Sequence, residues 1–541
     1  MFAKRPEHTK VYHMNKTDRR TFLKHSALGI AGLGLSSERQ TERVETKPPE
    51  NYFNIIWITC DEMNTKAMSV YGNPFTKMPA AEQMAEEGVA FSHAYVQMPK
   101  CVPSRCSMIT GRYPHCEGHR TLKGRKHYEP HIHVKRNWDF TLRQHEPNLV
   151  KFLRDRGYKT ALIGKNHLVD WNLHKVWFDK TSEWDSPEWK NRGNPFTDDV
   201  SEEMRRTHSR GKVKEDYDYH RHQDSLYARW SIDFIRENKD KPFLALIDFG
   251  NPHPPYAEYT KMPAYRIPLT EIPVPKALPL EKTPSVERAK RTSYALEGLT
   301  EDERRAIRRS YYTMCEFADS RVRRVIDEVD RLELTDRTLI IYSADHGDFN
   351  GERNMYEKWD TCFYEEIVNV PLIMRLPGVI PSNKRLDQLV EYVDIVPTIV
   401  QILGCKIPRW VQGKSLLNLI QAKTTAHKDA VFSQGGVEKA AMLQLAPYKR
   451  PDGTIKPKQK VLHDYPRAMA RAKMIRTERH KYIYRLEGDC ELYDLKRDPD
   501  EMHNLAYDPN YRDVICELKD RMLRFTIESE TNLPEIDLLE A

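Results

Sequence analysis

Short, nearly continuous apolar runs recur along the chain and predict buried strands. They cover residues 54–59 (NIIWIT), 160–163 (TALI), 243–247 (FLALI), 338–342 (TLIIY) and 371–374 (PLIM). Runs of this length that are rich in branched and aromatic residues are typical of parallel strands covered on both faces. The sequence therefore predicts a buried sheet assembled from segments that are far apart in the chain.

Helical patterns lie between these runs. Residues 79–87 begin with Pro79 and stop before Gly88, which suits a helix because proline is favoured in the first turn and glycine just past the last. A longer stripe of apolar residues at helical spacing follows: Met314, Phe317, Val322, Val325, Ile326, Val329 and Leu332. This alternation predicts an α/β fold in which helices sandwich a large, mostly parallel sheet.

Two regions depart from the alternation. Residues 254–300 are rich in proline and charge and predict a long connection over the surface. From about residue 426 the pattern changes to short strands and one helix, at 430–433, 481–485, 491–495 and 510–528. We therefore expect a main domain at 52–425 and a smaller C-terminal α+β subdomain with an antiparallel sheet at 426–541.

Composition narrows the class of protein. The 541 residues are 39% hydrophobic and include 27 tyrosines, which argues against both a multi-span membrane protein and a disordered chain. The net charge is 86 − 79 = +7, which suits either a solvated surface or an anionic partner. No zinc-finger spacing or RNA-binding aromatic motif accompanies this charge, so no nucleic-acid partner is predicted.

The N-terminus carries a twin-arginine pattern. Arg19 and Arg20 stand in the segment DRRTFLK, before a mildly apolar stretch at 26–35 that is too short to span a bilayer. The pattern resembles a bacterial Tat leader, so we expect a signal segment at 1–37 and a polar linker at 38–51. It implies recognition by the Tat export machinery, a periplasmic or secreted location, and no membrane span in the mature protein.

Polar side chains follow four of the predicted strands directly. They lie at 60–62, 164–167, 248–253 and 343–348. Ligands of open α/β sheets bind beyond the carboxyl ends of the strands. Because those ends meet along one edge of a parallel sheet, we expect the four polar segments to form a single site.

A cysteine motif indicates the chemistry of that site. Residues 101–112 are CVPSRCSMITGR, which resembles the signature of the type I, formylglycine-dependent sulfatases of the alkaline-phosphatase-like superfamily. Similar stretches follow in the family's order, at 157–168, 251–255, 338–348, 364–373 and 474–505. The likeness is to bacterial sulfatases of the polysaccharide type, and it implies the alkaline-phosphatase-like α/β fold.

The resemblance implies a sulfuric ester hydrolase. In that family the motif cysteine, here Cys101, is oxidised to formylglycine (3-oxoalanine) by a formylglycine-generating or sulfatase-maturating enzyme. The hydrated aldehyde offers two hydroxyls, one of which attacks sulfur while the other later expels sulfate. A covalent intermediate thus divides one difficult step into two easier ones.

The resemblance also implies roles for individual side chains. Arg105 is expected to hold the formylglycine and the metal-bound oxygens, and Lys165, His253 and Lys358 are expected to grip the sulfate oxygens. His253 or Lys358 would protonate the leaving alcohol, and His167 would be the base for sulfate expulsion.

A divalent metal is implied at four residues of the same site: Asp61, Cys101, Asp345 and His346. Ca²⁺ is the first expectation, because carboxylate-rich sets suit hard cations, and Mn²⁺ or Mg²⁺ are alternatives. The chain departs from the commonest pattern, since Cys60 stands where many relatives have a first Asp and His346 where some have Asn. The imidazole favours Mn²⁺ as the rival ion, and Glu62, where the family more often has Gln, is a further carboxylate.

Two stretches bear on the substrate. Residues 120–136 hold six Lys or Arg and three His but one acidic residue, and four tryptophans follow His167: Trp171, Trp177, Trp184 and Trp189. Basic groups bind sulfate or uronate, and indole rings stack on sugars. Both stretches also suit ordinary surface and packing, but together they favour a sulfated, acidic polysaccharide or oligosaccharide as the substrate.

Three functions stay open. The first is an exported sulfatase acting on a sulfated carbohydrate. The second is a phosphonate monoester or phosphodiester hydrolase of the same superfamily, which the pair Asp61 and His346 permits. The third is a catalytically inactive glycan-binding relative, which the intact Cys101, Arg105 and Lys165 disfavour.

Overall fold

The computed structural model describes residues 52–115, 142, 146–169, 174–182, 222–436 and 457–530. These residues belong to one compact unit, Thr46–Ala541. Several predicted features lie outside them: the signal segment at 1–37, the linker at 38–51, the basic stretch at 120–136, and Trp171, Trp184 and Trp189. Among the helices in the described ranges, none combines the length and apolarity needed to cross a bilayer.

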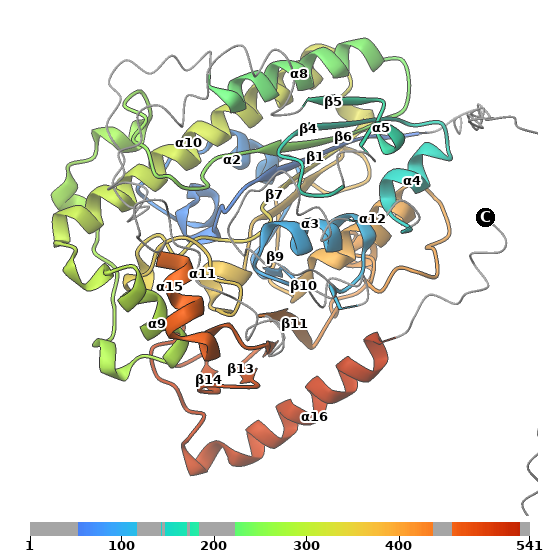
Figure 1. Ribbon diagram of the computed structural model, residues 1–541. Helices are drawn as coiled ribbons and strands as arrows, with labels where there is room; N and C mark the ends of the chain where they lie inside the picture. Colours follow the sequence, from blue (N-terminus) through green and yellow to red (C-terminus); the bar gives the residue numbers. More distant parts are fainter. Residues whose placement is uncertain are drawn as a thin grey trace, which may run out of the picture. The chain divides into compact units, whose positions relative to one another are not determined.

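An eight-stranded sheet forms the centre of this unit (Figure 1). From edge to edge its strands are β5 (Lys180–Ser182), β4 (Lys159–Gly164), β6 (Phe243–Phe249), β1 (Asn54–Cys60), β7 (Thr338–Ser343), β8 (Leu372–Arg375), β2 (Val89–Phe91) and β9 (Lys384–Leu386). Neighbours pair in parallel except at β8, which runs antiparallel to β7 and β2. The predicted large, mostly parallel sheet is confirmed, and each predicted strand is present with its ends shifted by a residue or two.

The three central strands end level with one another. β1, β6 and β7 are buried along their whole length, which accounts for their continuous apolar runs. The register places Thr59 beside Asp248 on one side and beside Ser343 on the other. The polar segments that follow these strands therefore begin at the same edge of the sheet.

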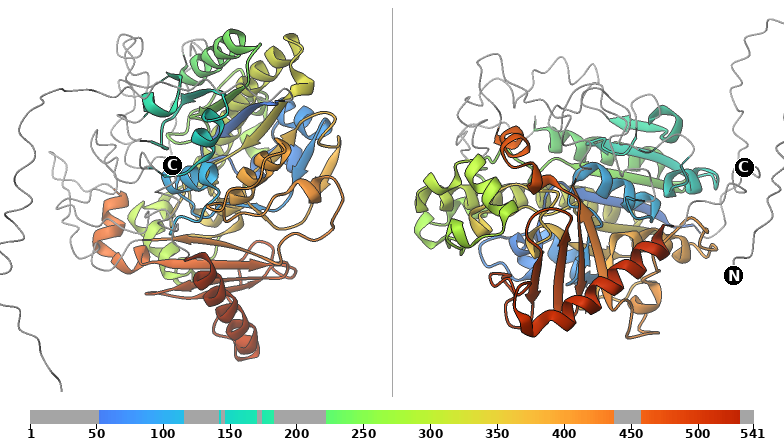
Figure 2. Two further views of the ribbon diagram at one scale, coloured as in Figure 1. Left: turned by 90° about the vertical axis from the view of Figure 1, so that its right-hand side faces the viewer. Right: turned by 60° about the horizontal axis from the view of Figure 1, so that its bottom comes forward.

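Helices cover both faces of the sheet (Figures 1 and 2). One group comprises α2 (Pro79–Glu86), α8 (Gln223–Asn238) and α10 (Glu301–Arg331), and the other α3 (Cys101–Thr110), α4 (Leu149–Arg154) and α12 (Ile395–Ile402). The predicted apolar stripe between Met314 and Val329 faces inward on α10. That helix begins with a capping box, in which Thr300 and Glu303 each accept a hydrogen bond from the other's backbone N–H.

The C-terminal region forms a second sheet, with α16 (Arg512–Ser529) across one face (Figure 2). Its antiparallel strands are β11 (Ala430–Gly435), β12 (Ala472–Thr477), β13 (His480–Arg485) and β14 (Glu491–Asp494). The predicted antiparallel sheet and terminal helix are confirmed. β12 was not predicted, because Lys473 and Arg476 interrupt its apolar residues. The domain boundary at residue 426 stays a prediction.

The expectation of a surface connection at 254–300 is wrong in part. The stretch 254–300 is partly interior, because it contains α9 (Ser285–Ser293), whose Glu287 and Lys290 are fully buried. Its polar composition misled the prediction, since these charges pair with groups elsewhere in the fold. For Trp177 the packing alternative is confirmed, because this residue is 2% exposed and packs in the hydrophobic core, so it is not available to stack on a sugar.

Buried ion pairs attach the second sheet to the body of the protein. Lys481 of β13 is fully buried, and its ammonium lies 2.7 Å from both Glu365 and Glu501. It also donates a hydrogen bond of 2.9 Å to the Phe363 carbonyl oxygen. Glu365 begins α11 (Glu365–Val368), just before β8, so this lysine adds a charged contact between the second sheet and the main body to the apolar contacts that they share.

Replacing Lys481 with methionine should lower the free energy of unfolding by about 3–5 kcal/mol, because two buried carboxylates lose their cation. Chemical denaturation measures the change. The control is Lys496→Met, since Lys496 and its partner Glu478 are both exposed; we expect a change within about 0.5 kcal/mol there. Equal effects of the two substitutions would contradict a structural role for the buried pair.

Candidate active site

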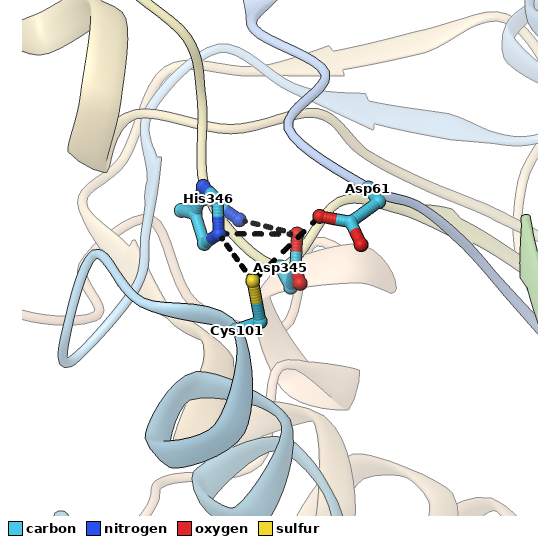
Figure 3. Close-up of side chains that lie close together, drawn as sticks. All are labelled: Asp61, Cys101, Asp345 and His346. Atoms are coloured by element: carbon cyan, nitrogen blue, oxygen red, sulfur yellow. Dashed lines mark hydrogen bonds and ion pairs between the residues drawn. The ribbon is translucent and has the colours of Figure 1, made fainter. Parts of the chain in front are cut away.

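The polar segments that follow β1, β4, β6 and β7 supply one group of side chains beyond the carboxyl edge of the sheet. Asp61 follows β1, Lys165 follows β4 and Asp345 follows β7. Cys101 is the first residue of α3, and its side chain lies beside those of Asp61 and Asp345 (Figure 3). The sequence-based expectation of a single site at this edge agrees with this arrangement.

Four buried side chains of the site point ligand atoms toward one another (Figure 3): Asp61, Cys101, Asp345 and His346. One such atom from each lies within 4.8 Å of all the others. Cys101 Sγ is 3.2 Å from His346 Nε2 and 3.8 Å from Asp61 Oδ1. His346 Nδ1 lies 3.1 Å from the Gly347 carbonyl oxygen, so Nε2 is the nitrogen that faces the group.

This donor set fits a divalent cation. Two carboxylates and an imidazole, all fully buried, converge on residue 101, and these are the ligand types that Ca²⁺, Mg²⁺ and Mn²⁺ accept. The four residues are those predicted as ligands from the sequence. The structure therefore brings together a set capable of holding the predicted metal.

Arg105 links the acidic residues of the site. Its Nε lies 2.8 Å from Asp345 Oδ2, its Nη1 2.7 Å from Asp248 Oδ1 and its Nη2 3.5 Å from Asp61 Oδ2. Burial alone would lower the pKa of Arg105, but the carboxylates raise it well above its usual value. The guanidinium is thus a fixed positive charge that holds three chain segments in place.

Asp248 is a site residue that sequence reasoning did not single out. Burial raises the pKa of its carboxyl to about 6, although Arg105 opposes the shift. The available signal was a charged residue within an otherwise apolar strand, since β6 has the sequence FLALIDF. A buried carboxylate in a central strand requires a partner, and Arg105 supplies it.

Lys165 contacts Asp61 directly. Burial would raise the pKa of Asp61, but the positive charges of Lys165, Arg105 and Lys358 outweigh it and hold that pKa well below its usual value. Burial lowers the pKa of Lys165, yet Asp61 more than compensates and the pKa is raised. The pair is therefore a carboxylate and an ammonium at neutral pH, which are the charge states that the predicted metal ligand and the predicted anion-binding lysine require.

A second cluster adjoins the first and contains His253, Lys358 and Glu62. Lys358 Nζ lies 3.1 Å from His253 Nε2 and contacts the Glu62 carboxylate. His253 Nε2 is 3.5 Å from Glu62 Oε1. Burial, aided by the charge of Lys165, lowers the pKa of His253 to about 4, so its imidazole is neutral at pH 7. The sequence offered Glu62 as a further carboxylate for the metal, and the structure places it against Lys358.

His167 completes the set of predicted site residues. It lies in the loop that follows β4, two positions after Lys165, and its side chain is partly buried. Its role in sulfate expulsion stays a prediction. The predicted residues thus all come from loops at this edge or from the start of α3.

Comparisons with known proteins identify the family to which the chain is similar. A family model described as Sulfatase matches residues 53–405, and one described as N-sulphoglucosamine sulphohydrolase, C-terminal, matches residues 458–528. Arylsulfatase K of Mus musculus is 26% identical over 89% of this chain and 80% of its own length. An ulvan-active sulfatase of Formosa agariphila is 24% identical over 92% and 86%. The choline-sulfatase of Rhizobium meliloti is 26% identical over 84% and 83%.

Solved structures share the fold. A 2-O GAG sulfatase superposes with a TM-score of 0.66 at 23% identity, covering 89% of this chain and 93% of its own. The phosphonate monoester hydrolase of Agrobacterium radiobacter superposes with a TM-score of 0.67 at 21% identity, covering 88% and 96%. The family match at 53–405 covers more than half of the chain and includes the cysteine motif. The chain belongs to the sulfatase family and is a sulfuric ester hydrolase.

Proposed function

We propose that this protein is an exported bacterial sulfatase that removes sulfate esters from a sulfated polysaccharide or oligosaccharide through a formylglycine made from Cys101. The observation that carries the proposal is the position of Cys101. Its side chain adjoins the carboxylate and imidazole of the ligand group, within a site where Arg105 and Lys165 supply positive charge. A negatively charged sulfate ester requires such an arrangement.

The unmodified thiol is poorly suited to be the nucleophile. Burial, together with the Asp61 carboxylate, raises the pKa of the Cys101 thiol well above its usual value. A thiol in that state stays protonated at neutral pH, whereas cysteine enzymes act through the thiolate. Oxidation to the aldehyde removes this obstacle, because its hydrate supplies hydroxyls at the position that the sulfur occupies.

The metal would be held by Asp61, Asp345, His346 and the modified residue 101. When bound, a divalent cation supplies positive charge to the sulfate oxygens and favours ionisation of a hydroxyl group. Ca²⁺ is the ion we propose first, because two carboxylates are hard oxygen donors. Mn²⁺ is the rival, because His346 contributes an imidazole nitrogen.

The remaining cations have separate tasks in this proposal. Arg105 orients the ligand carboxylates, and Lys165 binds a sulfate oxygen beside Asp61. Lys358 and the neutral His253, 3.1 Å apart, lie where the ester oxygen would leave, and Lys358 carries the proton that this oxygen needs. His167 takes up a proton when the second hydroxyl of the hydrate expels sulfate.

The substrate class rests on the relatives and on the sequence. The similar proteins include an ulvan-active sulfatase, a 2-O GAG sulfatase and a protein solved with its substrate D-glucosamine-2-N,6-O-disulfate. The basic stretch at 120–136 suits acidic sugars. A sulfated, acidic carbohydrate is therefore the substrate that we propose.

A second function has its own support. The phosphonate monoester hydrolase has the same fold, and the metal pattern of Asp61 and His346 suits a phosphorus ester equally well. A phosphonate monoester or phosphodiester carries one negative charge, as a sulfate monoester does. Only a comparison of substrates with one common leaving group separates the two activities.

Mass spectrometry of the tryptic peptide 101–105, from protein made with a maturating enzyme, should give the mass of an aldehyde in place of the thiol. The same preparation should release sulfate from a sulfated polysaccharide, and Cys101→Ala should abolish that release because the hydrate is lost. A wild-type protein that retains the thiol yet still releases sulfate would refute the mechanism. Faster cleavage of a phosphodiester than of the matched sulfate ester would favour the second function, and absence of any hydrolysis the glycan-binding alternative.

Removal of divalent metal with a chelator should lower the melting temperature, and Ca²⁺ should restore it. Saturation at about 100 times Kd adds about 2.7 kcal/mol of stability. Asp345→Asn should abolish this response. Asp248→Asn should retain the Ca²⁺ response, because Asp248 lies outside the ligand group. It is a matched control, since Asp248 and Asp345 both pair with Arg105. An equal Ca²⁺ response in both variants would contradict the ligand assignment.

Export should depend on the arginine pair near the N-terminus. Replacing Arg19 and Arg20 with lysine should retain the protein in the cytoplasm of a bacterium that has a Tat pathway, while the unaltered chain reaches the periplasm. Cell fractionation with an immunoblot measures the distribution. Periplasmic delivery of the double variant would contradict Tat export.

A further inference from the structure

A lysine outside the described site binds the backbone of the loop that carries Lys358. Lys290, on α9, is fully buried. Its Nζ donates hydrogen bonds to three consecutive carbonyl oxygens, those of Tyr356 at 2.5 Å, Glu357 at 2.8 Å and Lys358 at 3.2 Å. An ammonium group has three N–H donors, so it can bind all three oxygens at once.

Aromatic rings surround the same ammonium group. Nζ lies 5.0 Å from the ring centre of Phe349 and 5.7 Å from those of Tyr294 and Trp359. Rings at these distances attract a cation through their negative faces. The surroundings of Lys290 are thus built for a positive charge that is directed at one short stretch of backbone.

The peptide at Glu357 is held from its other side as well. Its N–H donates to Tyr256 Oη at 2.8 Å and to Asp348 Oδ1 at 3.2 Å. Tyr256 Oη in turn donates to Asp348 Oδ2 at 2.7 Å. Glu357 has a φ of +57°, which a residue with a side chain rarely adopts. Such a conformation persists when its surroundings hold it, as they do here on both sides.

The residue that follows this peptide is Lys358, whose ammonium reaches His253 and Glu62. Its backbone position is set by the fixed Glu357 peptide and by its own carbonyl oxygen, which Lys290 binds. A long, flexible side chain can meet a target only where its backbone is placed. Direct contacts therefore connect Lys290 on α9 with the backbone of Lys358, and the side chain of Lys358 with His253 in the site.

We propose that Lys290 is a positioning residue for the reaction, fixing the loop at 356–358 so that Lys358 can protonate the departing ester oxygen. The inference rests on the proposed function, in which Lys358 has that role. Lys290 itself touches neither substrate nor reacting atoms. It acts by holding the Lys358 backbone, so its effect on the reaction must pass through Lys358.

A kinetic double-mutant cycle tests this dependence. The four proteins are the wild type, Lys290→Met, Lys358→Ala and the double variant, each assayed after maturation with aryl sulfates of good and poor leaving groups. We expect Lys290→Met to lower kcat by about 10²-fold for the poor leaving group and by much less for the good one. The double variant should be no slower than Lys358→Ala alone, because both changes remove the same contribution.

Two further variants separate positioning from stability. Lys481→Met removes another fully buried lysine that binds a backbone carbonyl oxygen, that of Phe363 and not those at 356–358; it should lower the melting temperature but leave the leaving-group dependence unchanged. Tyr256→Phe removes the hydroxyl that accepts from the Glu357 N–H. It should reproduce the Lys290→Met pattern more weakly, and it carries the test if Lys290→Met does not fold.

The contrary outcomes are distinct. If Lys358→Ala alters the leaving-group dependence while Lys290→Met and Tyr256→Phe leave it unchanged, the positioning role is wrong and the proposed function stands. If the effects of Lys290→Met and Lys358→Ala multiply, Lys290 does not act through Lys358, which also overturns the inference. If Lys358→Ala leaves the dependence of an active sulfatase unchanged, the proton-donor role fails and the positioning role fails with it.

Discussion

The concentration of buried charge at one edge of the sheet is the constraint on which the rest of the structure depends. Asp61, Asp248 and Asp345 are almost fully buried within reach of Arg105. A buried carboxylate without a partner costs several kcal/mol, so each must be matched by a cation in fixed geometry. The three carboxylates come from central parallel strands or the residues after them, and the level ends of those strands bring the charges together.

The same constraint determines where the reactive residue can lie. Cys101 begins α3, and Arg105 lies one helical turn further along the same helix. Because the guanidinium is bound to carboxylates from β6 and from the loop after β7, the start of α3 is held above the ends of those strands. The motif that contains both residues therefore encodes the proposed nucleophile together with the guanidinium that anchors its helix.

The distinction between local patterns and contacts across the chain explains how much of the structure the sequence could predict. The long buried strands are continuous apolar runs, and α10 has an apolar stripe at helical spacing. The site loops follow the strands directly, so the sequence could predict both the strands and the loops. β2, β5 and β9 have three residues each, too few for a pattern. The contact of Glu62 with Lys358, the pairing of Asp248 with Arg105 and the burial of Lys290 depend on segments far apart in the chain. No local pattern reports such contacts, and a charged residue is ordinarily expected at the surface.

The buried lysines show why that expectation fails in this fold. Lys481 and Lys290 are both fully buried and both bind backbone carbonyl oxygens. Lys481 also has two carboxylates at 2.7 Å, those of Glu365 on α11 and of Glu501 after β14, so it pairs with a charge on each side. Lys290 instead directs its three donors at three successive oxygens of one loop. Apolar packing could fill the same space, but it could not fix the direction of those carbonyl groups. The three hydrogen bonds of Lys290 offset the cost of burying its charge. They also fix the backbone conformation of the loop from which Lys358 reaches the proposed site.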